Sequence, residues 1–321
     1  MIMNKKIKKM LRKSERLRLF WEKFSLLKAK SGLVVGDESF TKKSFHKRVG
    51  RVLDLGNPKT FSDKLNFLKL NYRDSLITQC TDKYLVREYV KSLGYGDILN
   101  ELYGVYDSFG AIDFEELPEK FFLKCNHTSG ANYLYNAAAK IDLPFLEKKF
   151  NFYMRKNFYY LQREWNYKDI KPLIIAEKIL KDSDNNFPVD YKIFCFNGQP
   201  HLVMYCEGLC DDKGERGEAF SNFYDMDFQL LDLKINNENI PSHSIVMPQN
   251  FFRMKEIAAA LSKPFPFCRV DLYNINGRII FGELTFFHAA GLNIIEPLEW
   301  EFKMGDWLDL EQRNLYNGTW T

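Results

Sequence analysis

The sequence lacks several features that would place it in a membrane or an oxidising compartment. It has no run of about 18 apolar residues, the length from which a membrane-spanning helix is recognised. Its first residues, MIMNKKIKKMLRKSERLR, contain no apolar core of a secretory signal. Its six cysteines form no CxxC pair, so we expect reduced thiols in a cytoplasmic protein.

Positive charge is concentrated at the beginning of the chain. Residues 1–30 hold eleven Lys and Arg against two glutamates, a net charge of +9, whereas the whole chain of 321 residues carries +4. Met10, Leu17 and Phe24 recur every seven residues, which predicts an amphipathic basic helix. This helix would lie on anionic lipid at the inner face of the membrane or pack its apolar stripe on protein. We favour packing because Trp21 and Phe24 suit a protein groove, and we expect no binding of nucleic acid.

The order of predicted elements indicates an α+β protein with a helical N-terminal region. At 37.9 kDa the chain is large enough for two to three lobes. We expect a basic helical region, a second helical segment, a smaller lobe and a larger lobe, at residues 1–56, 57–110, 111–171 and 172–321. The smaller lobe should contain a long aromatic-rich helix near Leu146 to Glu164, and the larger lobe an antiparallel sheet.

The segment FCRVDLYNINGRIIFGELTFFHAAG predicts two strands joined by a tight Asn-Gly turn. Residues two apart in a strand share a face, so Arg269 and Asp271 point one way, and Glu283 and Thr285 share a face. The hairpin could therefore bring two carboxylates and a guanidinium to one patch. Such carboxylates suit Mg²⁺ together with substrate phosphates, and Arg269 suits charge on a transferred phosphoryl or acyl oxygen. Charged residues on a solvated hairpin face are the alternative.

Candidate phosphate ligands lie upstream of the hairpin. In FFLKCNHTSGAN an apolar strand ends at Lys124, and a loop of small and hydroxylic residues follows, which leaves backbone N–H groups free for phosphate. Within that loop His127, Ser129 and Gly130 are candidate contacts, although His127 would equally suit a bond to its own backbone. Lys83, in TDKYLVREYV, lies in the first turn of a predicted helix, where the helix dipole does not favour a cation. Its ammonium is therefore expected to point at a ligand.

Two further segments lie between the phosphate loop and the hairpin. PLIIAEKIL is an apolar strand that ends at Glu177, Lys178 and Ile179. VDYKIFCFNG predicts a strand and a tight turn, with Asp190 and Lys192 on one face. Lys192 is a candidate ligand for a phosphate or an acyl phosphate, and an ion pair across the strands is the alternative.

In this order, the segments resemble the nucleotide site of the ATP-grasp superfamily. Within the superfamily, the chain is similar to the TupA-like (teichuronopeptide-biosynthesis-type) branch, found in loci for bacterial capsule and surface polysaccharides. The segments that carry this similarity are NPKTFSDKLNFLKL, TDKYLVREYV, KCNHTSG, DYKIFCFNG and FCRVDLY. The resemblance covers about residues 57–300. It implies an ATP-grasp fold of two α+β lobes that clamp ATP, with Glu177 to Ile179 as the hinge at the adenine edge. It also implies Mg²⁺ held by Asp271, Glu283 and Thr285, although Asn is common where this chain has Thr.

The resemblance implies an ATP-dependent carboxylate–amine ligase. ATP would phosphorylate a carboxylate to an acyl phosphate, and an amine would then leave an amide. The expected carboxylate is a uronic acid of a surface polysaccharide or of its sugar-nucleotide precursor, and the acceptor is an amino acid or small amine; the reverse assignment is equally open. Lys83, Lys124 and Lys192 would hold phosphates, and Arg269 would stabilise the transferring group. His288, in TFFHAAGLN, would take a proton from the acceptor or cap the turn.

Other functions fit parts of the same pattern. A sugar kinase or other phosphotransferase would keep the fold and use a hydroxyl acceptor. A glycosyltransferase of polysaccharide biosynthesis would use Asp225-x-Asp227 for metal and leave Lys83, Lys124 and Glu177 without a role. A non-catalytic ATP-binding scaffold of a capsule-assembly complex is the last alternative. The first 110 residues show almost no strand pattern, unlike the opening α/β domain of many ATP-grasp enzymes, so the acceptor pocket cannot be carried over.

Overall fold

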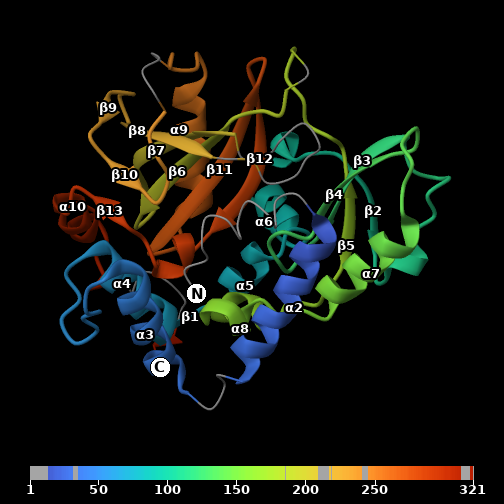
Figure 1. Cartoon of the computed structure of the whole chain (residues 1–321). Coiled ribbons are helices and arrows are strands. Elements are labelled where there is room, and N and C mark those ends of the chain that lie inside the picture. The colour runs from blue at the N-terminus through green and yellow to red at the C-terminus, as the bar shows by residue number, and fades with distance from the viewer. Residues whose placement is uncertain are drawn as a thin grey trace.

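The computed structural model describes residues 14–31, 35–184, 186–208, 217, 219–240, 245–311 and 319–320. Its strands form two main antiparallel sheets, on opposite sides of the molecule in Figure 1. None of the helices it describes is long and apolar enough to cross a bilayer.

The smaller sheet has the strand order β2-β5-β3-β4. Its strands are β2 (Leu102–Tyr106), β3 (Lys120–Cys125), β4 (Asn132–Asn136) and β5 (Ile174–Glu177). Buried apolar residues of β3 and β5 pack with those of α7 (Leu143–Met154) in a separate small core. The predicted range 111–171 for the smaller lobe stays a prediction, and two strands of this sheet, β2 and β5, lie outside it.

The larger sheet has the strand order β12-β11-β6-β7-β8-β9. Its strands are β6 (Asp190–Phe196), β7 (Gln199–Glu207), β8 (Phe220–Asp225), β9 (Leu230–Leu231), β11 (Phe267–Ile275) and β12 (Arg278–Thr285). Helix α9 (Phe251–Ser262), predicted around Met254 to Leu261, packs on β6, β7 and β11. Because side chains alternate along a strand, Cys268 and Val270 lie on the face of β11 that packs on α9. The polar residues of β11 lie on the opposite face.

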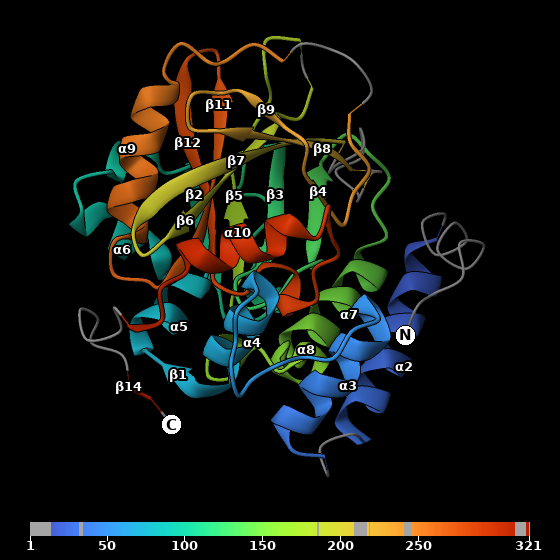
Figure 2. The ribbon, with the colours of Figure 1, turned by 90° about the vertical axis from the view of Figure 1, so that its left-hand side faces the viewer.

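The remaining helices lie below and between the two sheets. They are α2 (Glu15–Ser31), α3 (Asp37–Val49), α4 (Phe61–Asn71), α5 (Ser75–Thr81), α6 (Val86–Ser92), α8 (Tyr159–Gln162) and α10 (Glu299–Trp307). Single 3-10 turns are η2 (Gly96–Ile98), η3 (Phe109–Ala111), η4 (Trp165–Tyr167) and η5 (His288–Gly291). Short two-residue strands are β1 (Tyr72–Arg73), β10 (Lys234–Ile235), β13 (Ile295–Glu296) and β14 (Thr319–Trp320). Figure 2 shows α4 and α10 side by side, where the buried Glu301 carboxylate accepts hydrogen bonds from the backbone N–H and the hydroxyl of Ser62.

Segment α5–α6 connects the two sheets. Asp82, directly after α5, accepts a hydrogen bond from Asn126 behind β3 (2.9 Å), whereas α5 and η2 pack on β12. On the same segment the Tyr89 hydroxyl donates to the Leu261 carbonyl of α9 (2.9 Å). The segment around Lys83 therefore lies between the smaller sheet and the hairpin of the larger one.

The predicted long helix near Leu146 to Glu164 is wrong in its extent. Helix α7 ends at Met154, and the short α8 begins only at Tyr159. The carbonyl of Tyr153, in the last turn of α7, is contacted by the His127 ring (3.0 Å). The same carbonyl accepts the Lys156 N–H (3.0 Å), so a tight last turn and a side chain from another element together satisfy this C-terminal carbonyl.

Helix α2 turns the opposite face inward from the one that we expected. Its two glutamates lie on one side and form ion pairs with buried lysines of the segment around α7, Glu15 with Lys149 (2.5 Å) and Glu22 with Lys156 (2.9 Å). Leu19 and Leu26 share that side and are buried. The other side exposes large apolar side chains: Leu17 (43%), Phe20 (71%), Phe24 (53%) and Leu27 (68%). Leu17 and Phe24 of the predicted stripe are therefore not packed on the protein's own core, because the two ion pairs fix the rotation of the helix. Met10 lies outside the described residues.

Candidate active site

The predicted hairpin is present, and a β-bulge at Gly282 places Glu283 on its polar face. The turn has left-handed φ values at Asn276 (51°) and Gly277 (80°), as a two-residue hairpin requires. With regular pairing from that turn, Glu283 would lie opposite Val270 on the α9 face. The register instead shifts at Gly282, and Glu283 lies directly opposite Asp271. One extra residue therefore turns Glu283 and the next alternate residues to the polar face.

Arg269 is the centre of a buried polar cluster on that face. Its guanidinium donates to both carboxylate oxygens of Asp271 (2.6 Å each). It also donates to Glu283 (3.3 Å) and Thr285 (3.0 Å). On the neighbouring strand β6, the Lys192 ammonium donates to Asp271 (2.6 Å). Three strands thus bring together the residues that the sequence separates by up to 93 positions.

Electrostatics keep this cluster ionised despite its burial. Burial alone would raise the pKa of Asp271, but Arg269 and Lys192 together hold it below its usual value. Asp190, on the same face of β6, pairs with Lys192 (2.8 Å), yet burial raises its pKa. The predicted common face of Asp190 and Lys192 is confirmed, and so is the alternative ion pairing of Lys192.

The donor set at Asp271 and Glu283 fits magnesium. Among the described residues no group of three or more His, Cys, Asp and Glu converges on one point. Mg²⁺ is usually held by one or two carboxylates with substrate phosphates completing its shell, so the two carboxylates of the hairpin are the group to test. The Glu283 side chain is 44% exposed and can present an oxygen outward, whereas both oxygens of Asp271 are engaged by Arg269 and Lys192.

His288 lies in a strained turn against Arg269. Its Nδ1 is 2.5 Å from an Arg269 nitrogen and accepts that N–H, so the ring proton belongs on Nε2. Nε2 is buried and has no hydrogen-bond partner in the described part of the chain. The following Ala289 (φ 48°) and Ala290 (φ 57°) occupy the left-handed region, which is unfavourable for a residue with a Cβ. Helix α4 holds the turn, since Lys69 donates to the Ala290 carbonyl (2.6 Å).

The environment of His288 does not fit the expected role as proton acceptor. Burial, followed by the Arg269 cation, holds its pKa well below the usual value. One ring nitrogen is occupied by Arg269 and the other carries the proton. His288 is therefore a neutral hydrogen-bond donor through Nε2.

A second polar cluster lies on the smaller sheet. The Lys124 ammonium on β3 donates to Glu177 at the end of β5 (2.9 Å), and Arg87 of α6 lies 3.9 Å from the same carboxylate. After Glu177, the backbone N–H of Lys178 donates to the Glu101 carbonyl (3.0 Å). The Ile179 backbone has no hydrogen-bond partner among the described residues.

The loop behind β3 is closed by the Cys125 N–H, which donates to the Ala131 carbonyl (3.2 Å). Ser129 and Gly130 are exposed at its tip, with Gly130 at φ 88°. In the described part of the chain, no acceptor takes their backbone N–H groups. Lys83 lies in the turn before α6, not in its first helical turn, and its ammonium donates to the Thr128 carbonyl of this loop (3.1 Å).

His127 is anchored inside the protein at both ring nitrogens. Nδ1 contacts the Asn126 side chain (3.1 Å) and Nε2 the Tyr153 carbonyl. Burial lowers its pKa, and the residue is 2% exposed. These contacts favour a structural role for His127, although its partners are the Asn126 side chain and the Tyr153 carbonyl and not its own backbone.

The structure adds polar residues that sequence reasoning missed. Lys69 and Asn66 of α4 both bond carbonyls of the His288 turn, and Asn126 ties the phosphate loop to Asp82. Glu164, just before η4, is buried beside this region. Lys69 and Asn66 occur in the apolar helix FSDKLNFLKLN, and a polar residue on an apolar face was the available signal.

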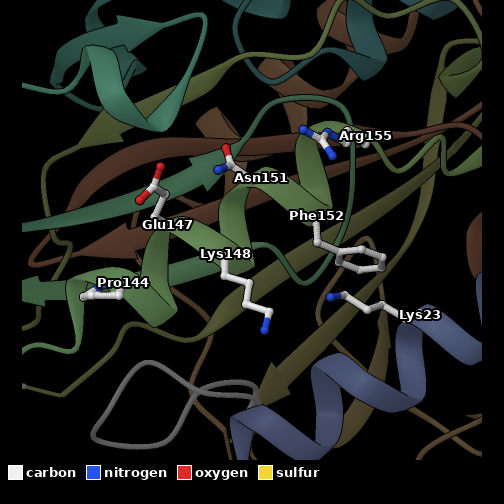
Figure 3. A pocket seen from close by; sticks show the side chains of 7 residues that line it. All are labelled: Lys23, Pro144, Glu147, Lys148, Asn151, Phe152 and Arg155. Atoms are coloured by element: carbon white, nitrogen blue, oxygen red, sulfur yellow. The ribbon is translucent and has the colours of Figure 1, made fainter.

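Other features of the surface lie apart from these clusters. Figure 3 shows a hollow between α2 and α7, lined by Lys23, Pro144, Glu147, Lys148, Asn151, Phe152 and Arg155, none of them a predicted site residue. Asp225 uses its carboxylate to accept from the backbone N–H groups of Asp227 (2.9 Å) and Gln229 (2.8 Å). The Asp-x-Asp segment therefore closes a turn after β8, three strands from Asp271 in the sheet order.

A family model and solved structures are similar to this chain. No curated protein matches the chain. Among solved structures, D-alanine–D-alanine ligase from Bacillus anthracis is 14% identical, with 80% of this chain and 78% of that one covered and a TM-score of 0.46. L-amino acid ligase from Bacillus licheniformis is 13% identical, with 67% and 44% covered and a TM-score of 0.42. The model of the TupA-like ATPgrasp family matches residues 63–309.

That match spans most of the chain and includes both polar clusters. The resemblance inferred from the motifs is therefore confirmed, and the fold is the ATP-grasp fold. The chain belongs to the TupA-like ATP-grasp family.

Proposed function

We propose that the protein joins the carboxylate of a uronic acid, in a surface polysaccharide or its sugar-nucleotide precursor, to an amine through an acyl phosphate. The observation that carries the reaction is the bulged hairpin, which places the partly exposed Glu283 beside the buried Asp271 and Arg269. Two carboxylates and a guanidinium suit the charge that develops when a phosphoryl group moves to a carboxylate. Capsule or surface-polysaccharide synthesis is the proposed context.

The nucleotide is proposed to lie between the two polar clusters. The Lys124 ammonium and the free N–H groups of Ser129 and Gly130 suit phosphate oxygens. The unpaired Ile179 backbone suits the adenine edge, and Lys178 and Glu177 flank it on the hinge. Because Lys83 already bonds the loop at Thr128, its proposed contribution is to shape the loop and add positive charge beside it.

Magnesium is proposed to be held by Glu283 and Asp271, with Thr285 offering its hydroxyl oxygen. Bound there, the ion would neutralise charge on the phosphates and polarise the transferring group. Lys192 and Asp190 keep the buried site close to charge balance.

In the proposed reaction the chain's own residues orient the reacting groups and stabilise the negative charge that develops on them. Arg269 faces the oxygen on which negative charge develops, and its fork to Asp271 fixes its direction. The Nε2–H of His288 donates to a phosphoryl or acyl oxygen, which supplies the acceptor that the buried N–H lacks. The carboxylate oxygen attacks the γ-phosphorus of ATP, and ADP leaves. The neutral amine then attacks the acyl carbon, phosphate leaves with the bonding electrons, and the departing phosphate takes the proton from the amine nitrogen.

The deciding experiment incubates the purified protein with ATP, Mg²⁺, uronic-acid nucleotides and amino acids. We expect a condensation product by mass spectrometry, with ADP and phosphate released in equal amounts. Glu283→Gln should abolish it, whereas Asp227→Asn, a matched change at the exposed turn after β8, should not. A phosphorylated sugar without an amide would identify a kinase instead, and turnover in Glu283→Gln equal to wild type would contradict the metal assignment.

We also propose that α2 attaches the enzyme to the inner face of the membrane. Four apolar side chains on its exposed side form a contiguous stripe, at Leu17, Phe20, Phe24 and Leu27. The first 30 residues carry a net charge of +9, which complements anionic lipid. Basic amphipathic helices with such a stripe lie in the bilayer interface.

A further inference from the structure

The turn that carries His288 is strained and is held in place from outside. Ala289 and Ala290 have φ values of 48° and 57°, in the left-handed region that is unfavourable for a residue with a Cβ. Such a conformation persists only where surrounding contacts over-determine it, and it clusters at functional sites. The residues that hold the turn therefore bear on its function.

Two side chains of α4 bond consecutive carbonyls of this turn. The Lys69 ammonium donates to the Ala290 carbonyl (2.6 Å), and the Asn66 amide donates to the Gly291 carbonyl (2.8 Å). The two donors lie three positions apart and so share one side of the helix. Gly291 admits this close approach, because a Cβ there would lie 2.6 Å from the Asn66 Nδ2. The two contacts fix the direction in which the backbone leaves His288.

The stability of the fold alone does not account for these two polar residues. Lys69 is 2% exposed and donates to no other described residue. Asn66 is fully buried, and its Oδ1 has no hydrogen-bond partner in the described part of the chain. A buried ammonium with one neutral acceptor and a buried unsatisfied amide oxygen both cost free energy. Lys64 of the same helix differs, because it is partly exposed and donates to two carbonyls at the end of α10 (2.8 Å each).

The His288 ring connects this turn to the hairpin cluster. Its Nδ1 accepts an N–H of Arg269 (2.5 Å), and the same guanidinium donates to Asp271 and Glu283. On the other side of the turn, the Asn293 amide donates to the His288 carbonyl (3.2 Å). A shift of the turn would therefore move the ring off Arg269 and redirect its Nε2–H.

We propose that Lys69 and Asn66 are positioning residues of the reaction. By holding the strained turn, they keep the His288 ring on Arg269 and aim its Nε2–H at the substrate oxygen. The proposal rests on the donor role of His288 in the ligase reaction proposed above. Both residues act through the turn, so helix α4, which belongs to neither sheet, sets the geometry of the cluster.

The first measurement reads the position of the ring without turnover. The full-length protein is labelled with ¹⁵N-histidine, and His288→Gln identifies the signals of His288 among those of the five histidines. In the wild type we expect the tautomer protonated at Nε2, with Nδ1 bonded to Arg269. Lys69→Met removes the donor at a similar length, so we expect the turn to relax and the two ring-nitrogen signals to move toward one another. Asn66→Leu repeats the measurement at the second contact.

Lys64→Met is the matched control for this measurement. It removes a lysine of the same helix that also bonds backbone carbonyls, but those of α10 and not those of the turn. The His288 signals should stay in place. The rise in unfolding temperature caused by a non-hydrolysable ATP analogue with Mg²⁺ reports that each variant is folded.

A second substitution separates the hold on the turn from any other role of Lys69. Ala290→Gly relieves the strain, because glycine adopts a left-handed φ without a Cβ. In that background the turn depends less on Lys69, so Lys69→Met should shift the His288 signals less than it does in the wild type. A double-mutant cycle measures this non-additivity. A role confined to packing would give the same effect in both backgrounds.

In the ligase assay, Lys69→Met and Asn66→Leu should lower kcat at least about tenfold and leave KM for ATP unchanged, since misplacing a reacting group by about 1 Å can cost about 10²-fold. Ala290→Gly should restore part of the rate to Lys69→Met, and Lys64→Met should retain the wild-type rate.

Unchanged His288 signals in Lys69→Met would overturn the proposal, and so would an equal effect of Lys69→Met in both backgrounds. If the signals shift and Ala290→Gly restores them, but no condensation product forms, the hold of Lys69 on the turn stands and the ligase function is contradicted instead.

Discussion

At the scale of single residues, the site depends on protonation states that only the three-dimensional environment sets. The sequence identified His288 as a titrating base from the ordinary pKa of histidine. Its burial against Arg269 makes it a neutral donor. His288 stays a predicted site residue, and the role proposed for it follows from a contact between segments 19 positions apart.

The depressed pKa of His288 makes stability depend on pH. A histidine whose pKa is lower in the folded state contributes stability above its unfolded pKa of about 6.5, and this contribution is lost as pH falls toward the folded value. We expect the free energy of unfolding to fall below pH 6.5 with a slope of at most about 1.4 kcal/mol per pH unit from this group. His288→Gln should flatten the curve in urea titrations between about pH 7 and 5. His127→Gln is the comparison, since burial lowers the pKa of His127 as well.

An unchanged slope of the free energy of unfolding against pH in His288→Gln would contradict the assignment of His288 as neutral.

His288→Gln also tests the chemical role. Glutamine keeps a donor but cannot act as a base in this pH range. If the imidazole only donates, product formation should fall by less than about tenfold in His288→Gln and by much more in His288→Ala, since one oxyanion donor is worth about 10²–10³ in kcat. Activity measurements on both variants distinguish the roles, and equal losses would restore the proton-acceptor hypothesis.

At the scale of elements, the hairpin shows which features can be predicted from the sequence and which cannot. The Asn-Gly turn and the two strands follow from local chemistry, and they were predicted correctly. The bulge at Gly282 was not, although regular alternation would have placed Glu283 on the α9 face. A glycine inside a strand is the signal for a bulge, because it leaves room for close backbone approach.

Gly282→Ala should damage the hairpin at that bulge. A Cβ there would lie 3.0 Å from the Asp271 carbonyl oxygen, which is backbone and cannot rotate away. We expect a loss of about 1–3 kcal/mol in the free energy of unfolding, typical of overpacking, with reduced ATP turnover because Glu283 and Asp271 lose their register. Gly110→Ala, where a Cβ meets nothing within 4 Å, is the control in both measurements. Wild-type turnover in Gly282→Ala would show that the register tolerates the added atom.

At the scale of the whole molecule, local motifs fixed the order of the segments but not how distant segments meet. The rotation of α2 is an example. Its periodic apolar residues predicted an amphipathic helix correctly, whereas the face turned inward depends on Lys149 and Lys156, more than 130 positions away.

The exposed stripe of α2 gives the prediction at this scale. Phe20→Glu together with Phe24→Glu should reduce binding to vesicles of phosphatidylcholine and phosphatidylglycerol at least about tenfold, since burying one Phe contributes about 1.5–3 kcal/mol. Co-sedimentation measures the bound fraction, and binding of the wild type should weaken with added salt and with vesicles of phosphatidylcholine alone. The control replaces two phenylalanines that are also exposed, Phe252 (69%) and Phe302 (47%), by glutamate. If the α2 variant instead converts a dimer to a monomer while vesicle binding is unaffected, the stripe is an interface with a second copy of the chain and the membrane proposal is wrong.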